Sequence, residues 1–289
     1  MNDEAVLEQF ATRRPALHAL ACRLLGSTSE ADDAVQEAWL RVAVADTRAV
    51  RNPQAWLTTV VSRICLDMLR SRAVRREYSL DQLTGLDEQD HSDPERDAVL
   101  VDAVGRALLV VLDTLGPEER VAFVLHDLFA VPFAQIAPII GRTPGTAKKL
   151  ASRARLRARG DTARPAAGLT AEREVVSAFL AAARGGDLAE LLAVLAPDVV
   201  RTADTAALPA GVATVVRGAR AVAEETVLLR ARSQVAVPML VDGRVGIVVA
   251  PGGRAVSVLA VTVREQRVAA YEVIADPRRL AQLRLAALP

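Results

Sequence analysis

Apolar residues recur at helical spacing along the first part of the chain. From Pro53 onward they fall at i, i+3, i+4, i+7 and i+11, which are Leu57, Val60, Val61, Ile64 and Met68. A stripe with this period forms the buried face of an amphipathic helix. Ser29-Glu30-Ala31-Asp32 follows Gly26 as a capping-box pattern, and Asn52-Pro53 offers a cap with proline at the first helical position. Residues 4–73 therefore predict three helices.

An acidic stretch interrupts this pattern between Ser79 and Asp102. It holds eight acidic residues against one arginine and shows little apolar periodicity, which is typical of a solvated linker. Asp93-Pro94 restarts the helical pattern, and residues 99–158 predict a compact group of short helices. Proline and glycine pairs, of which Gly116-Pro117 is the first, separate these helices.

The pattern changes after residues 160–168, whose small and proline residues are typical of a joint between domains. Two helical stretches, 171–184 and 187–195, come first. Four valine-rich, strand-like runs follow, at 234–241, 244–250, 254–264 and 267–274. Asp242-Gly243 and Pro251-Gly252-Gly253 lie between runs as hairpin signals. The last part of the chain therefore predicts an α+β domain with a curved antiparallel sheet.

These elements predict a multidomain chain with two all-α domains followed by an α+β domain. A length of 289 residues predicts about two folding units rather than one. The expected divisions are a first helical domain (1–78), an acidic linker (79–98), a second helical domain (99–160), a short linker (161–169) and the α+β domain (170–289).

The overall composition excludes several classes of protein and selects no partner. Lys and Arg number 36 against 35 Asp and Glu, a net charge of +1, so a nucleic-acid signal has to come from where the charges lie. The two cysteines, Cys22 and Cys65, are far apart and lack a CxxC motif or a histidine cluster, so we expect no disulfide, metal or cofactor. The acidic N-terminus and the absence of a long apolar run predict a cytoplasmic protein without a membrane contact.

Residues 142–160 carry seven basic residues and no acidic residue. Their small apolar residues form an inward stripe, namely Ala147, Leu150, Ala151, Ala154 and Ala158. A helix-turn-helix is predicted here. Its first helix includes residues 133–137, a turn follows near Gly141, and Thr143-Pro144 supplies the cap and first position of the second helix. The second helix would enter the major groove of DNA, with Thr146, Lys149 and Arg153 directed at bases or phosphates. A solvated basic helix is the alternative, but it would usually contain glutamates at i,i+4.

A second basic segment and an acidic helix lie upstream. Arg63 and Arg70 project away from the apolar stripe of the 53–73 helix, and arginines 72, 75 and 76 extend the positive charge past its end. Two basic surfaces on one chain suit an extended polyanion such as DNA. The 29–44 helix instead presents an acidic surface of Asp32, Asp33, Gln36 and Glu37, which suits a protein partner or is only solvated.

Three stretches resemble the extracytoplasmic-function (ECF) sigma factors of the σ70 superfamily, in the group with a C-terminal SnoaL-like domain. They are residues 30–42 (EADDAVQEAWLRV), 53–72 (PQAWLTTVVSRICLDMLRSR), and 124–129 (VLHDLF) continuing into 141–155 (GRTPGTAKKLASRAR). The order and spacing match over residues 5–158. Asp276-Pro277-Arg278-Arg279-Leu280 resembles the Asn-Pro-Asp-Lys-Leu type of motif near the end of this group.

The resemblance implies a promoter-specificity subunit of RNA polymerase without catalytic residues. Its partners would be core polymerase, through the β′ clamp helices and the β flap, and promoter DNA. The implied polymerase-binding residues are Asp32, Asp33, Gln36 and Glu37. The implied minus-ten residues are Trp56, Arg63, Arg70, Arg72, Arg75 and Arg76. The implied minus-thirty-five residues are Arg142, Thr143, Thr146, Lys148, Lys149, Ser152, Arg153 and Arg155. The SnoaL-like domain would contact the sigma domains and modulate their activity.

Two other functions remain open at this point. A one-component regulator, in which a ligand in the C-terminal domain governs the helix-turn-helix, explains the basic helix but leaves the acidic helix and the Arg63–Arg76 segment without a role. An enzyme in the C-terminal domain needs a catalytic group of residues. After residue 170 the chain has no histidine or cysteine and a single tyrosine, Tyr271, which disfavours this reading.

Overall fold

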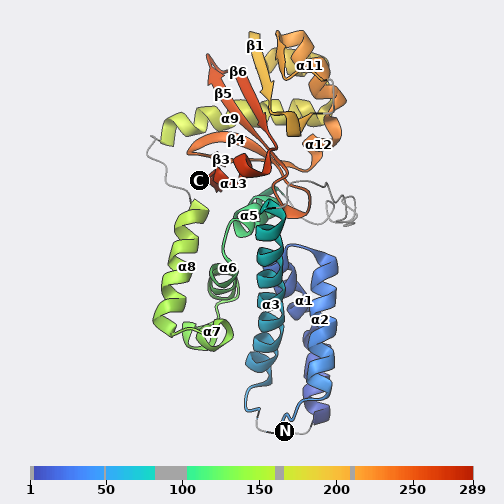
Figure 1. The fold of residues 1–289 in the computed structure, drawn as a ribbon, viewed down its shortest axis with the longest axis vertical. Coiled ribbons are helices and arrows are strands. Elements are labelled where there is room, and N and C mark those ends of the chain that lie inside the picture. The colour runs from blue at the N-terminus through green and yellow to red at the C-terminus, as the bar shows by residue number, and fades with distance from the viewer. Residues whose placement is uncertain (1–2, 49, 82–102, 160–165, 209–211, 289) are drawn as a thin grey trace. The chain divides into compact units, whose positions relative to one another are not determined.

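The computed structural model describes residues 3–48, 50–81, 103–159, 166–208 and 212–288, which form two compact units. The first unit is helical and ends within α8, at Arg155. Its elements are α1 (Asp3–Leu25), α2 (Thr28–Ala43), α3 (Pro53–Asp81), α6 (Pro117–Phe123), the π-helix η1 (Val124–Leu128), α7 (Phe133–Ile140) and α8 (Pro144–Arg159) (Figure 1). The second unit contains α5 (Ala103–Asp113) and the chain from Leu156 onward.

The helices of the first unit follow their predicted apolar stripes. On α3, Leu57, Val61 and Ile64 are buried, and the helix continues to Asp81, past the expected start of the linker at Ser79. Residues 82–98 of that linker lie outside the described residues. The capping residue of α2 is Ser27 and not Ser29 as predicted: the Ser27 hydroxyl accepts a hydrogen bond from the Glu30 amide at 3.4 Å.

A helix-turn-helix is confirmed at α7 and α8. Gly141 ends α7 in the left-handed conformation (φ 66°), which glycine adopts without steric strain. Thr143 caps α8, since its hydroxyl accepts a hydrogen bond from the Thr146 amide at 3.2 Å. Ala147, Ala151 and Ala154 are buried along α8. The small side chains of this stripe allow close packing and leave the opposite side of the helix in solvent.

The second unit is built on a seven-stranded sheet in the order β2-β1-β6-β5-β4-β3-β7. The strands are β1 (Leu195–Ala203), β2 (Val215–Arg217), β3 (Ala236–Val241), β4 (Arg244–Val249), β5 (Ser257–Arg264), β6 (Arg267–Ile274) and β7 (Leu285–Ala286). The four predicted runs are β3 to β6. The sheet is mixed, because β1 pairs in parallel with β6; the prediction of an antiparallel sheet was wrong there, since a strand that enters through a crossover can run either way.

The remaining helices of this unit are α9 (Ala166–Gly185), α10 (Leu188–Val194), α11 (Ala219–Leu228), α12 (Arg230–Gln234) and α13 (Pro277–Gln282). Short 3-10 turns lie at Thr205–Ala207 and Pro251–Gly253. Helix α9 begins at Ala166, earlier than the predicted start at 171, so part of the expected 161–169 linker is helical.

Both faces of the sheet are covered by helices. Along β3, Ala236 and Leu240 belong to the apolar core beside α9, whereas Val237, Met239 and Val241 belong to a second core with Val110 and Val111 of α5. Alternate residues of a strand point to opposite faces, so an all-apolar strand needs a cover on each side. Helix α5 supplies the second cover, although the sequence placed it in the helical block at 99–160.

Helix α5 also lies close to the 3-10 turn Pro251–Gly253, between β4 and β5. A Cβ atom at this residue would collide with the side chain of Leu109 on α5. Gly253 also has a positive φ of 79°, so glycine meets both a steric and a conformational requirement here. None of the helices in the described part of the chain is long and apolar enough to cross a membrane.

Candidate nucleic-acid and polymerase interfaces

The side of α8 opposite its buried alanines is cationic and exposed. Lys148, Lys149 and Arg153 are exposed, and among the described residues none of the three has an ion-pair partner. Thr146 and Ser152 on the same helix are half-buried. Unpaired cations on the second helix of a helix-turn-helix are available to phosphates and base edges, the contacts such helices make in the major groove.

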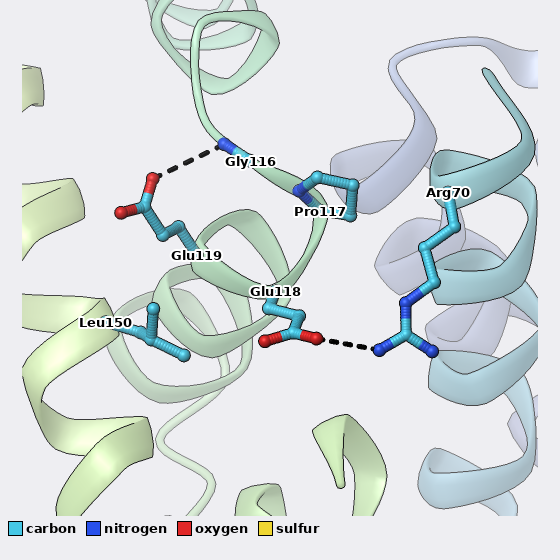
Figure 2. Close-up of a pocket in the computed structure, with 6 residues that line it drawn as sticks. All are labelled: Arg70, Gly116, Pro117, Glu118, Glu119 and Leu150. Carbon is cyan, nitrogen blue, oxygen red and sulfur yellow. Dashed lines mark hydrogen bonds and ion pairs between the residues drawn. The ribbon is translucent and has the colours of Figure 1, made fainter. Parts of the chain in front are cut away.

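Three other predicted DNA-binding arginines are engaged within the first unit. Arg63 of α3 donates a hydrogen bond to the Pro138 carbonyl of α7 at 3.0 Å. That carbonyl lies in the last turn of α7, where backbone acceptors lack partners in the helix. Arg70 of α3 binds Glu118 of α6 (Figure 2), and Arg142 of the turn before α8 binds the same carboxylate. Cations predicted to hold two different promoter elements therefore share one carboxylate.

The Glu118 contacts form a compact charged cluster. Arg70 donates to Glu118 Oε1 at 2.8 Å, and Arg142 donates to Oε2 at 3.0 Å and to Oε1 at 3.2 Å. Partial burial raises the pKa of Glu118, but the hydrogen bonds and charges of Arg142 and Arg70 outweigh it, so the pKa lies below its ordinary value. A pocket of about 340 Å³ lies beside the cluster, with Leu150 of α8 on its wall (Figure 2).

The other predicted minus-ten residues have different environments. Arg72 donates to the Leu25 carbonyl at the end of α1 at 3.1 Å and pairs with Glu30 of α2, so it holds α3 to its neighbours. Arg75 is exposed and Trp56 is half-buried. The side chain of Arg76 lies outside the described residues.

Arg155 of α8 is paired with Asp127 of η1, at 2.6 Å between Nε and Oδ1. The same guanidinium lies 3.2 Å from His126, whose ring stacks on Phe133 with 4.0 Å between ring centroids. Sequence reasoning missed Glu118 and Asp127 as partners of DNA-binding cations. Their only sequence signal was an acidic residue near a helix end, which usually means capping.

The predicted polymerase-binding residues share one exposed face of α2. Asp32, Asp33, Gln36 and Glu37 are all exposed, while Ala31, Ala34, Val35, Ala38 and Val42 form the buried face of the helix. Asp32 lies 3.2 Å from His18 of α1, and Glu37 pairs with Arg41 one turn later. Asp33 and Gln36 lie between these contacts on the solvent side.

Comparisons with known proteins assign these two stretches of the chain to a family. The family model for Sigma-70 region 2 matches residues 10–75, and the model for Sigma-70 region 4 matches residues 105–157. The ECF RNA polymerase sigma factor SigJ of Mycobacterium tuberculosis is 40% identical over 94% of this chain and 92% of its own length. The chain belongs to the ECF sigma factors. Sigma factors bind core RNA polymerase and promoter DNA and are not enzymes, which decides against the enzyme and the one-component regulator.

Two further comparisons also concern proteins of M. tuberculosis. The probable ECF RNA polymerase sigma factor SigI of M. tuberculosis is 38% identical over 70% of this chain and 70% of its own length. The crystal structure of M. tuberculosis SigJ covers 94% of this chain and 97% of its own, with 36% identity and a TM-score of 0.43. In this sigma factor the region 4 match includes α5, so region 4 contributes helices to both compact units.

Proposed function

We propose that α8 recognises the minus-thirty-five element of the promoter. The observation that carries this proposal is the row of exposed, unpaired cations opposite the buried alanine stripe. Lys149 and Arg153 are four residues apart and lie on one face of the helix. The residues proposed to contact this element are Arg142, Thr143, Thr146, Lys148, Lys149, Ser152, Arg153 and Arg155.

Charge reversal on α8 tests this role. Lys149→Glu and Arg153→Glu should each lower run-off transcription from a promoter chosen by the wild-type holoenzyme from a random pool, by roughly 10- to 100-fold. Co-purification with core polymerase should stay unchanged. Arg220→Glu reverses an exposed charge on α11 and serves as the control. Equal loss of polymerase binding and transcription in the α8 variants would contradict a specific role in DNA recognition.

We propose that α3 holds the opened minus-ten strand. A groove for single-stranded DNA combines positive charge with surfaces on which bases stack, and this helix supplies both. The residues proposed for this role are Trp56, Arg63, Arg70, Arg72, Arg75 and Arg76. Arg72 would act through the position of α3, because its guanidinium is bound to Leu25 and Glu30.

We propose that the exposed acidic face of α2 docks on the β′ clamp helices and that region 4 also contacts the β flap. Asp33→Lys should weaken binding to core polymerase, because Asp33 is exposed and lies in the middle of the acidic face. Asp67→Lys is the control for reversal of a surface charge, because Asp67 of α3 is exposed and has no ion-pair partner in the described residues. A polymerase affinity that falls equally in both variants would argue against a docking role of Asp33. Since core polymerase is the partner, we place the protein in the cytoplasm.

We propose that the C-terminal domain modulates initiation through α5. We assign residues 170–289 to this domain, which resembles a SnoaL-like fold. The two sigma domains are proposed to span residues 1–78 and 99–160. The sheet of the C-terminal domain buries Val110 and Val111 of α5, which belong to region 4. A change in this sheet that moved α5 would therefore act on the first helix of region 4. Deletion of the domain would expose these valines, so a point substitution at the contact is the cleaner test.

A further inference from the structure

The C-terminal domain contains a cavity of about 80 Å³ between the sheet and the helices α9, α11 and α12. Its wall is mostly apolar, with Phe179 and Ala183 from α9 and Ile247 from β4 among the lining residues. Concave apolar sites with a few polar groups are the usual form of small-molecule sites in proteins. The cavity lies wholly within the second unit and uses none of the residues proposed for polymerase or promoter binding.

A buried ion pair borders this cavity. Arg201 of β1 is 1% exposed and binds Glu225 of α11 through both Nε, at 2.8 Å, and Nη2. Arg201 Nη1 also donates to the Ala213 carbonyl at 3.0 Å. Burial of two charges in an apolar core is unfavourable, and apolar residues of equal volume are often at least as stable. The pair is neutral as a whole, and the Glu225 side chain keeps 20% exposure.

The inner polar groups of the cavity are bonded to one another. The Thr226 hydroxyl donates to the Val222 carbonyl at 2.7 Å, so the Tyr271 hydroxyl, 3.3 Å away, is the donor to Thr226. Burial raises the pKa of Tyr271 to about 12, so this hydroxyl is neutral at pH 7. Because these groups already have partners, an apolar ligand can lie against them without leaving a polar atom unsatisfied.

The charge at the entrance indicates the polar end of the ligand. Arg232 of α12 lines the cavity, is exposed, and makes a 3.3 Å hydrogen bond to the Ala207 carbonyl. Glu225 neutralises Arg201, which leaves Arg232 as the uncompensated charge among the cavity-lining residues. A negative ligand group would gain from this cation, whereas a positive group would be repelled.

We propose that this cavity binds a small aliphatic carboxylate, with its apolar end among Phe179, Ala183 and Ile247 and its carboxylate beside Arg232. The size of the cavity limits the apolar end. An apolar cavity of about 150 Å³ accommodates benzene, so about half of that volume holds a chain of roughly three to four carbons. Short straight or branched fatty acids have this shape and charge.

A chain-length series tests the proposal on the full-length protein without polymerase. Calorimetric titration with acetate, propionate, butyrate, valerate and hexanoate should show an affinity that rises about fourfold for each carbon added, the equivalent of 0.8 kcal/mol per buried methylene. The rise should stop near valerate, where the cavity is full. Butyramide should bind more weakly than butyrate, and butylamine should not bind.

Two variants and one control locate the binding. Arg232→Gln should weaken valerate about fivefold, as expected for an exposed charge pair, and Arg220→Gln should leave it unchanged. Ala183→Leu should abolish binding by filling the cavity, and circular dichroism checks that this variant is folded. If Ala183→Leu is unfolded, the comparison of Arg232→Gln with Arg220→Gln alone tests the site. The proposal is overturned if no acid binds up to roughly 10 mM, if affinity is independent of chain length, if butylamine binds as well as butyrate, or if both arginine variants behave alike.

Discussion

Replacement of Glu118 by glutamine separates stability from DNA binding in this sigma factor. In the free protein, Glu118 holds Arg70 and Arg142 by ion pairs of 2.8 and 3.0 Å. A DNA phosphate that binds either arginine competes with Glu118 for its positive charge. Glu118→Gln keeps the shape of the side chain and removes its charge, so we expect tighter DNA binding together with lower stability.

The magnitude follows from the exposure of the pairs. The side chains of Arg70 and Arg142 are 48% and 52% exposed, against 22% for Glu118, so each pair contributes about 0.5–1 kcal/mol. Together they contribute about 1–2 kcal/mol, which corresponds to at most about a 5- to 30-fold gain in promoter affinity. The free energy of unfolding should fall by a similar amount.

Fluorescence anisotropy of a labelled promoter duplex with the holoenzyme measures the affinity, and urea unfolding of the free protein measures the stability. Asp67→Asn is the matched control, because Asp67 is exposed on α3, close to Arg70 in sequence, and has no ion-pair partner in the described residues. An equal gain of affinity in both variants would mean that removal of negative charge alone is responsible. A gain in neither variant would refute the competition between Glu118 and DNA.

The remaining predictions concern acid, the α5 contact and the cysteines. The pKa of Glu118 is depressed in the folded protein. Its stabilising effect is therefore present above the ordinary glutamate pKa and is lost as the pH falls through the folded pKa. The difference in unfolding free energy between wild type and Glu118→Gln should be full at pH 7 and vanish in acid. In urea unfolding, Gly253→Ala should destabilise the protein by about 1–3 kcal/mol more than Gly252→Ala. Both glycines have a positive φ, but an added Cβ collides with Leu109 only at residue 253. Equal effects would mean that the α5 contact tolerates the methyl group. Burial raises the pKa of Cys65 to about 12. In native protein, iodoacetamide should therefore modify the partly exposed Cys22 well before Cys65, as followed by mass spectrometry. Comparable rates of modification would contradict the packing of Cys65.

Local patterns were enough to predict much of this chain. The apolar stripes of α3 and α8 and the turn residues around Gly141 and Asp242 depend on neighbours a few positions away, so spacing alone predicted the helix-turn-helix and the strands β3 to β6. The resemblance to the ECF sigma factors rested on the same local stretches, and the relatives confirm that family. The short strands β2 and β7 gave no periodic signal, because two or three residues are too few to show alternation.

Only the tertiary structure decided which distant groups meet. Arg70 and Glu118 are 48 positions apart, and Arg201 and Glu225 are 24 apart, so no spacing rule links either pair. The place of α5 followed from the sheet, since a strand that is apolar on both faces needs a second cover and α5 carries matching valines. Sequence determined which faces are apolar or charged through local geometry; folding selected the partner of each face, because that depends on the shape and charge of surfaces that residues far apart in the chain create together.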